Sequence, residues 1–189
     1  SDLCITPVSA RENHYVRIKA DNRLDADGTL RGTFTLTAEG QSDSNIRRIF
    51  TTGFRSEWKN TMESQLLAIS PKAKLLSVDY GKNPKDYQAA PIKITFRYEI
   101  PDYALKGEKE MFFRPLVMNN LYNQVRSYLR IATSLKERTY GFKDGCSRLV
   151  ELDETIQLPA GYKLANADKN ETMQGTGADF EGSLAQQGN

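Results

Sequence analysis

The sequence predicts a mainly β fold of the α+β class: an antiparallel β-sandwich-like domain with one long helix or two short helices inserted after the first hairpin. Apolar and polar residues alternate along several segments, which is typical of half-buried strands. One long segment instead repeats its apolar residues every three or four positions, as an amphipathic helix does. Strand and helix do not alternate throughout the chain, which argues against a parallel α/β fold.

The best-marked element is a long hairpin near the N-terminus. Every second residue is apolar from His14 to Ala20 and again over residues 29–38, so each segment is expected to bury one face of a strand. The turn between them is Asp25-Ala26-Asp27-Gly28, in which Gly28 can supply the positive φ that hairpin turns require.

A helical period follows the hairpin over residues 42–69. Its apolar stripe ends before Pro71, and Gly53 divides it, so one long helix or two short helices fit the pattern. We expect this stripe to pack on the sheet, in preference to forming a ligand shelf. Its members are Ile46, Ile49, Phe50, Phe54, Trp58, Met62, Leu66 and Ile69.

Further strands are expected after the helical segment. Glu154 interrupts the apolar face of one of them, for which a bulge or an edge position is the expected explanation. A short helix is expected within residues 121–129. The expected strands are Leu75–Tyr80, Ile92–Ile100, Lys109–Arg114 as a partner for Ile92–Ile100, Arg148–Leu158 and Tyr162–Ala165.

The chain is expected to have three parts. Residues 1–13 form an N-terminal arm, and residues 14–165 form the β-sandwich-like domain, with its helical insertion at about 42–70. Residues 166–189 are polar and rich in glycine, and we expect a truncated last hairpin there, with strands of the natural domain beyond Asn189.

Composition argues against several classes of function. The net charge is +2, from 26 Lys+Arg and 24 Asp+Glu, and no basic tract predicts a nucleic-acid or membrane surface. No apolar run approaches the roughly 20 residues that span a bilayer. One histidine and two cysteines cannot complete a structural zinc site, so we expect no metal and no cofactor.

The two cysteines leave two alternatives open. Cys4 and Cys146 can form a disulfide that ties the arm to the body if the protein is exported to an oxidising compartment. Two unrelated thiols are the plainer interpretation. Neither alternative implies a catalytic cysteine, because nothing places Cys4 at a helix N-terminus, where the pKa of its thiol would fall.

No complete catalytic constellation is visible, so the chain is not expected to be an enzyme. His14 would need a thiol, carboxylate or hydroxyl within hydrogen-bonding reach, in a cleft. Asp25-x-Asp27-Gly28 matches only half of a calcium loop and is better explained as a turn. Glu151 and Asp153 have the i, i+2 spacing of paired carboxylates, yet they fall on the solvated face of their strand.

Four tyrosines lie in or beside expected loops. They are Tyr80, Tyr87, Tyr103 and Tyr140. Exposed aromatic rings can bind a glycan or a peptide, whereas single loop tyrosines commonly act as packing anchors.

Several motifs resemble those of a bacterial family. From Ile5 onward the chain is similar to the β-rich domain of unknown function that follows the core in transglutaminase-like proteins. The motifs are Leu24-Asp25-Ala26-Asp27-Gly28-Thr29-Leu30, Gly40 before Ile46-Arg47-Arg48, Tyr98-Glu99-Ile100-Pro101-Asp102-Tyr103-Ala104, Lys136-Glu137-Arg138-Thr139-Tyr140 and, most telling, Ile156-Gln157-Leu158-Pro159-Ala160-Gly161-Tyr162.

The resemblance implies a position in a larger protein and no chemistry of its own. In such proteins the Cys-His-Asp machinery belongs to the preceding core, and no residue of this chain matches it. We therefore expect a non-catalytic accessory module of an exported bacterial protein, periplasmic or on the cell surface. Its partner would be the catalytic core or a neighbouring domain of the same polypeptide, on which it packs or for which it positions substrate.

The two hypotheses about function make different predictions. An accessory module should expose an apolar patch where the core docks. An independent glycan- or peptide-binding module should instead present exposed tyrosines in a groove.

Overall fold

We describe the fold from a computed structural model of the chain, over residues 7–89, 91–121, 126–129, 139–140, 146–165 and 169–187. The chain divides into two compact units, Ser1–Gln157 and Leu158–Asn189, and each is described by itself.

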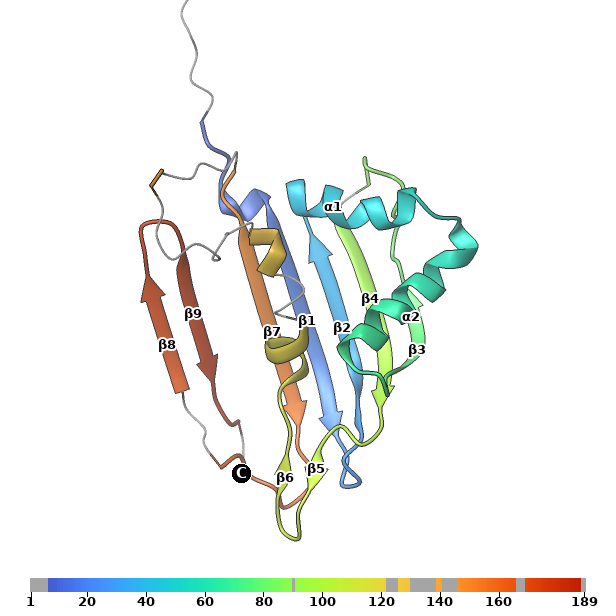
Figure 1. Cartoon of the computed structure of the whole chain (residues 1–189), viewed down its shortest axis with the longest axis vertical. Helices are drawn as coiled ribbons and strands as arrows, with labels where there is room; N and C mark the ends of the chain where they lie inside the picture. The colour runs from blue at the N-terminus through green and yellow to red at the C-terminus, as the bar shows by residue number, and fades with distance from the viewer. Residues whose placement is uncertain are drawn as a thin grey trace, which may run out of the picture. The chain divides into compact units, whose positions relative to one another are not determined.

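Unit 1 is built on one five-stranded sheet with the strand order β3-β4-β2-β1-β7 (Figure 1). Neighbouring strands are antiparallel except β1 and β7, which run parallel, so the sheet is mixed. The strands are β1 (Tyr15–Leu24), β2 (Leu30–Ala38), β3 (Lys74–Asp79), β4 (Ile92–Ile100) and β7 (Leu149–Gln157).

Two helices follow the first hairpin and lie on one face of the sheet (Figure 1). They are α1 (Gly40–Thr51) and α2 (Trp58–Ile69), separated by a bend at Gly53 and the short 3₁₀ turn η2 (Arg55–Glu57). Their apolar stripe joins the inward residues of the strands in a single core, to which it contributes Ile46, Phe50, Trp58, Met62 and Leu66.

The opposite face of the sheet is polar and open to solvent in the described part of unit 1. Its side chains pair across the strands: Thr35 and Thr95 share a hydrogen bond of 3.0 Å between their hydroxyl oxygens. Arg17 forms an ion pair with Glu151 of the neighbouring parallel strand. These exposed pairs favour the observed register without adding much stability.

The predicted mainly β, α+β fold, with two short helices after the first hairpin, is confirmed. The two layers of this fold are the five-stranded sheet and the pair of helices that packs on it. Within the described residues of unit 1, no second large sheet faces the first.

Shorter elements connect these layers and differ in part from the sequence prediction. Met111–Phe112, within the segment expected to pair with Ile92–Ile100, forms β6 and pairs with β5 (Leu105–Lys106) instead. The expected helix at 121–129 overlaps the π-helical turn η3 (Val117–Leu121) and the 3₁₀ turn η4 (Arg126–Leu129); residues 122–125 lie outside the described residues. The turn η1 (Arg11–Asn13) precedes β1.

Unit 2 contains one antiparallel hairpin, β8 (Lys169–Gln174) and β9 (Asp179–Leu184). A hairpin is thus present within residues 166–189, where one was expected, whereas the strand prediction for 162–165 is wrong, because no ladder forms there.

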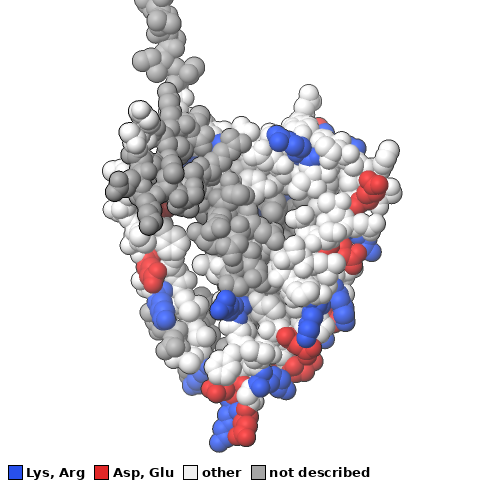
Figure 2. All heavy atoms as spheres, in the orientation of Figure 1, with Lys and Arg blue, Asp and Glu red and all other residues white. Residues whose placement is uncertain are grey.

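Acidic and basic side chains are interspersed over the described part of the helical face of unit 1 (Figure 2). Among the described helices, none is long and apolar enough to cross a membrane.

Candidate functional site

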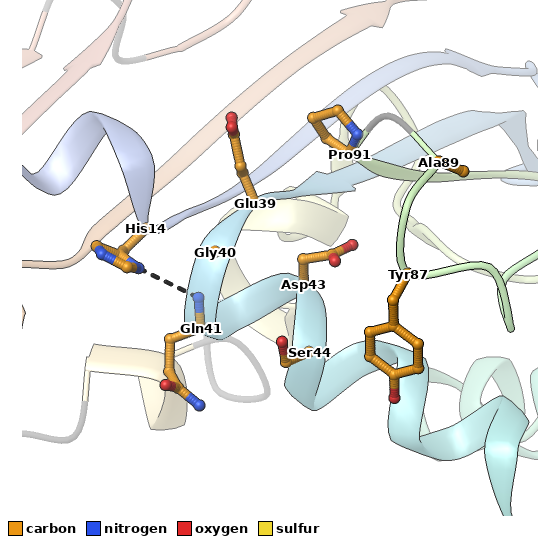
Figure 3. A pocket seen from close by; sticks show the side chains of 9 residues that line it. All are labelled: His14, Glu39, Gly40, Gln41, Asp43, Ser44, Tyr87, Ala89 and Pro91. Carbon is orange, nitrogen blue, oxygen red and sulfur yellow. Dashed lines mark hydrogen bonds between the residues drawn. The ribbon is translucent and has the colours of Figure 1, made fainter.

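A polar hollow of about 450 Å³ opens at the N-terminus of α1 (Figure 3). His14 lies on one side and Tyr87 on the other, with Gln41, Asp43 and Ser44 of α1 between them. Glu39, Gly40, Ala89 and Pro91 complete the lining.

The chain builds this hollow at the junction of β1, β2 and α1. Gly40 has a φ of +62°, which turns the chain from the end of β2 directly into α1. A Cβ atom there would lie 2.2 Å from the Asn13 carbonyl oxygen and 2.4 Å from His14 Nδ1. The close approach lets the Gln41 backbone N–H donate to His14 Nδ1 at 3.2 Å, which orients the imidazole ring.

A buried ion pair holds the wall of the hollow that carries Tyr87. The guanidinium Nε of Arg47 donates to both carboxylate oxygens of Asp43, at 2.9 and 2.8 Å. Nη1 of Arg47 donates to the carbonyl oxygens of Pro84 and Asp86, at 3.0 and 2.8 Å, and so anchors the loop between β3 and β4 on α1. Asp43 also accepts the Ile92 N–H at 3.0 Å.

The groups around the hollow are suited to hydrogen bonding and to stacking. The ring of Tyr87 is 53% exposed and presents a flat apolar surface. The imidazole, amide, hydroxyl and carboxylate groups of His14, Gln41, Ser44 and Glu39 provide donors and acceptors. Such a set can bind a hydroxylated molecule.

A second pocket, of about 240 Å³, lies beside α2 and the end of β3. Trp58 and Tyr80 line it together with Arg55, Asp79 and Lys82. Burial raises the pKa of the Tyr80 hydroxyl.

A buried carboxylate, Glu154, lies on the inward face of β7. It accepts the N–H groups of Leu116 and Val117 at 3.0 and 2.8 Å and the Asn22 amide at 2.8 Å. Burial raises the pKa of Glu154 despite these hydrogen bonds. Of the two explanations expected for Glu154, the edge position is confirmed, because β7 is an edge strand of the sheet. The bulge is wrong, since the register of β7 with β1 is continuous; the residue caps the turn η3.

The Tyr98 hydroxyl extends this network, because it donates to Asn22 Oδ1. Burial and the nearby Glu154 raise the pKa of Tyr98. The network satisfies polar groups inside the core, which is the usual condition for burying them.

The structure places the four predicted tyrosines in different surroundings. Tyr87 lines the larger hollow and Tyr80 the smaller pocket. Tyr103 packs against the core, and its hydroxyl donates to the Arg114 carbonyl oxygen. Tyr140 is 85% exposed.

Both alternatives for Cys4 and Cys146, a disulfide or two separate thiols, stay open. Cys146 is half-buried and is the one cysteine among the described residues; its backbone forms an isolated parallel bridge with Ser9. Cys4 lies outside the described residues, so the disulfide stays a prediction.

The other candidate carboxylates are engaged locally. Asp27 Oδ1 accepts the Thr29 N–H at 2.9 Å, and Asp25 pairs with Arg31 and with Arg23, at 2.9 Å from the latter. Both therefore stabilise the first hairpin turn. Glu151 lies in its exposed pair with Arg17.

An apolar strip is exposed on the small hairpin β5–β6. Leu105 and Phe112 lie directly opposite each other in the ladder and are 74% and 58% exposed. The sequence analysis did not predict this pair. The polar turn between the two residues is the feature of the sequence that could have indicated a hairpin.

Among the described residues, no three His, Cys, Asp or Glu side chains are grouped so that they could hold a metal ion. Comparison with known proteins finds no family model, no curated protein and no solved structure that matches the chain.

Proposed function

We propose that this chain is a non-catalytic accessory module of a larger exported bacterial protein with a transglutaminase-like core. It packs on that core, or positions substrate for it, through the apolar strip of β5–β6. The exposed pair Leu105 and Phe112 is the observation that carries this proposal.

The geometry of the strip supports docking. Because the two side chains are directly opposite in an antiparallel ladder, they project from the same face of the hairpin. Burying a side chain of this size contributes about 1.5–3 kcal/mol. A flat partner surface can cover both side chains at once, and removing their apolar surface from water then favours binding.

The proposal is tested first on the gene and then by binding. The reading frame that encodes this chain should carry a Cys…His…Asp core upstream of Ser1; a frame without one contradicts the proposal. The chain and that core are then expressed separately and mixed, and their affinity is measured by calorimetry.

A Leu105→Ser, Phe112→Ser double variant should weaken this binding about tenfold or more, which corresponds to 1.4 kcal/mol. Leu76→Ser, at an exposed leucine of β3, is the matched control and should bind as the wild type does. Equal losses in the two variants would show that the strip is not the docking surface.

A second candidate function is saccharide binding in the hollow between His14 and Tyr87. The exposed Tyr87 ring favours it, since sugar rings stack on aromatic faces while neighbouring polar groups bind their hydroxyls. Asp43 is paired with Arg47, whereas Glu39 adds a negative charge to the lining, which suits a neutral ligand better than an anion.

Nuclear magnetic resonance titration of the chain with glucose, N-acetylglucosamine and their β-linked disaccharides tests this candidate. Amide signals of Gln41 and Ser44 should shift and saturate, and Tyr87→Ala should weaken binding about tenfold. Tyr140→Ala, at another exposed tyrosine, is the control. Shifts that do not saturate, or that persist in Tyr87→Ala, count against a saccharide site.

A further inference from the structure

Two residues that line the pocket beside α2 each carry a buried hydrogen-bonding group without a partner among the described residues. Trp58 is only 5% exposed, and both it and Tyr80 line the pocket. In the part of the chain that the structure describes, neither the Trp58 indole N–H nor the Tyr80 hydroxyl has a hydrogen-bond partner. Buried polar groups are nearly always paired, so these two point to an occupant.

Packing holds the two groups in place. The rings of Phe50, Trp58 and Tyr80 contact one another edge to face, with centroids 5.1 to 5.7 Å apart. The three rings come from α1, α2 and the end of β3, so the cluster joins three elements. Groups that packing fixes in this way lose little freedom when they bind a ligand.

Positive charge surrounds the cluster. The guanidinium carbon of Arg55 and Lys85 Nζ lie 5.9 and 5.8 Å from the centroid of the Trp58 ring. Arg55 and Lys82 both line the pocket, whereas Lys85 lies outside the lining and donates to the Gly53 carbonyl oxygen at 3.3 Å. The acidic member, Asp79, already accepts the Gly81 N–H at 2.9 Å.

We propose that this pocket binds the carboxylate group of a small molecule, which accepts the Trp58 N–H and the Tyr80 O–H while Arg55 and Lys82 neutralise its charge. Charge-assisted hydrogen bonds from neutral donors and nearby cations are the arrangement that carboxylates favour. Arg55 and Lys82 are exposed, so their long side chains can adjust to contact the ligand as it binds. The pocket is far larger than the roughly 30 Å³ that one water molecule occupies.

Trp58 is the only tryptophan of the chain, so its indole signal reports on this pocket directly. The full chain is titrated with sodium acetate at constant ionic strength, and the indole N–H resonance and tryptophan fluorescence are followed. We expect a saturable downfield shift of the indole proton. Acetamide, which has the same shape without the charge, should give no saturable shift, and inorganic phosphate shows whether the site accepts anions in general.

Variants divide the proposal into its parts. An Arg55→Gln, Lys82→Gln double variant should weaken acetate binding about tenfold or more. Lys59→Gln removes one positive charge from an exposed position of α2 outside the pocket and should bind normally. Tyr80→Phe should weaken binding while leaving the free chain at least as stable as the wild type, because the hydroxyl it removes has no partner.

Three outcomes would overturn the proposal. An acetate shift that stays linear, or that sodium chloride or acetamide reproduces, indicates no carboxylate site. Equal losses of affinity in Lys59→Gln and in the double variant indicate non-specific attraction. An indole proton that gives a cross-peak to a long-lived water and ignores every anion assigns the pocket to an internal water.

Discussion

Gly40 occupies the point where the end of β2 turns into α1, against the residues that precede β1. Its positive φ and the short distances to Asn13 and His14 leave no room for a side chain. The shape of the larger hollow therefore depends on a glycine at position 40, where even the methyl group of alanine would not fit.

Gly40→Ala should lower the free energy of unfolding by about 2 kcal/mol or more, from strained φ and from overlap with the Asn13 carbonyl. Urea unfolding measures this loss. Gly53→Ala is the control, because a Cβ there meets nothing closer than a Glu57 side-chain oxygen at 3.5 Å. A Gly40→Ala variant as stable as Gly53→Ala would contradict the described turn.

Glu154 makes stability depend on pH. Burial raises its pKa above the ordinary 4.5, so the folded chain holds this proton more tightly than the unfolded chain does. The stabilising contribution is therefore complete below pH 4.5 and is lost as the pH rises through the raised pKa.

The free energy of unfolding of the wild type should accordingly fall, relative to that of Glu154→Gln, as the pH increases above 4.5. Urea unfolding of both proteins on either side of this pH measures the difference. Glu151→Gln, on the outward face of the same strand, should retain the decline of the wild type. A wild type that gains stability relative to Glu154→Gln as the pH rises above 4.5 would contradict the burial of this carboxyl group.

At the scale of elements, the loop between β3 and β4 is held on α1 by Arg47. Its side chain is almost fully buried and bonds to Asp43 and to two loop carbonyls. Removing one partner from a buried ion pair leaves the other charge without compensation.

Arg47→Met should therefore cost about 3–5 kcal/mol in urea unfolding. A double variant, Asp43→Asn with Arg47→Met, should lose less than the sum of the two single changes, because their charges interact. Arg48→Met, at the next and exposed position of α1, is the control and should change stability by about 0.5 kcal/mol or less. Similar losses at Arg47 and Arg48 would contradict the anchoring role.

Elements with a strong local period could be predicted from the sequence. The strand expected at Ile92–Ile100 forms over those residues as β4, and the helical stripe divides at Gly53 as expected. Alternation and helical spacing indicate which face of a segment is buried, and the same faces are buried in the folded chain. The parallel pairing of β1 with β7 leaves no such local mark, because it joins strands far apart in the chain.

The candidate sites were predictable only as separate residues. His14 and Tyr87 drew attention singly, but their meeting at one hollow depends on the Arg47 anchor of the loop. Glu154 was visible as a polar residue in an apolar face. Its role as a cap for η3 depends on a segment that approaches β7 only in the folded chain.

At the scale of the molecule, the main core belongs to unit 1. Among the described residues, all members of the hydrophobic core lie before Leu158. The strands β8 and β9 of unit 2 are almost entirely exposed, and an isolated hairpin of this kind is marginally stable in water.

A chain ending at Gln157 should therefore unfold cooperatively in urea, with a free energy of unfolding within about 1 kcal/mol of the full chain. Limited proteolysis of the full chain should cut within residues 158–189 first. Loss of the cooperative transition in the shortened chain would show that unit 1 needs unit 2 to fold.

The central claim, that the chain docks on a neighbouring core through β5–β6, is tested most directly by amide hydrogen exchange. Exchange is measured by mass spectrometry on the chain alone and on the chain mixed with the core encoded in the same reading frame. We predict that exchange slows across residues 105–112 when the core is present and that the Leu105→Ser, Phe112→Ser variant shows no slowing. Unchanged exchange across these residues, with slowing on the polar face of the sheet instead, would contradict the claim.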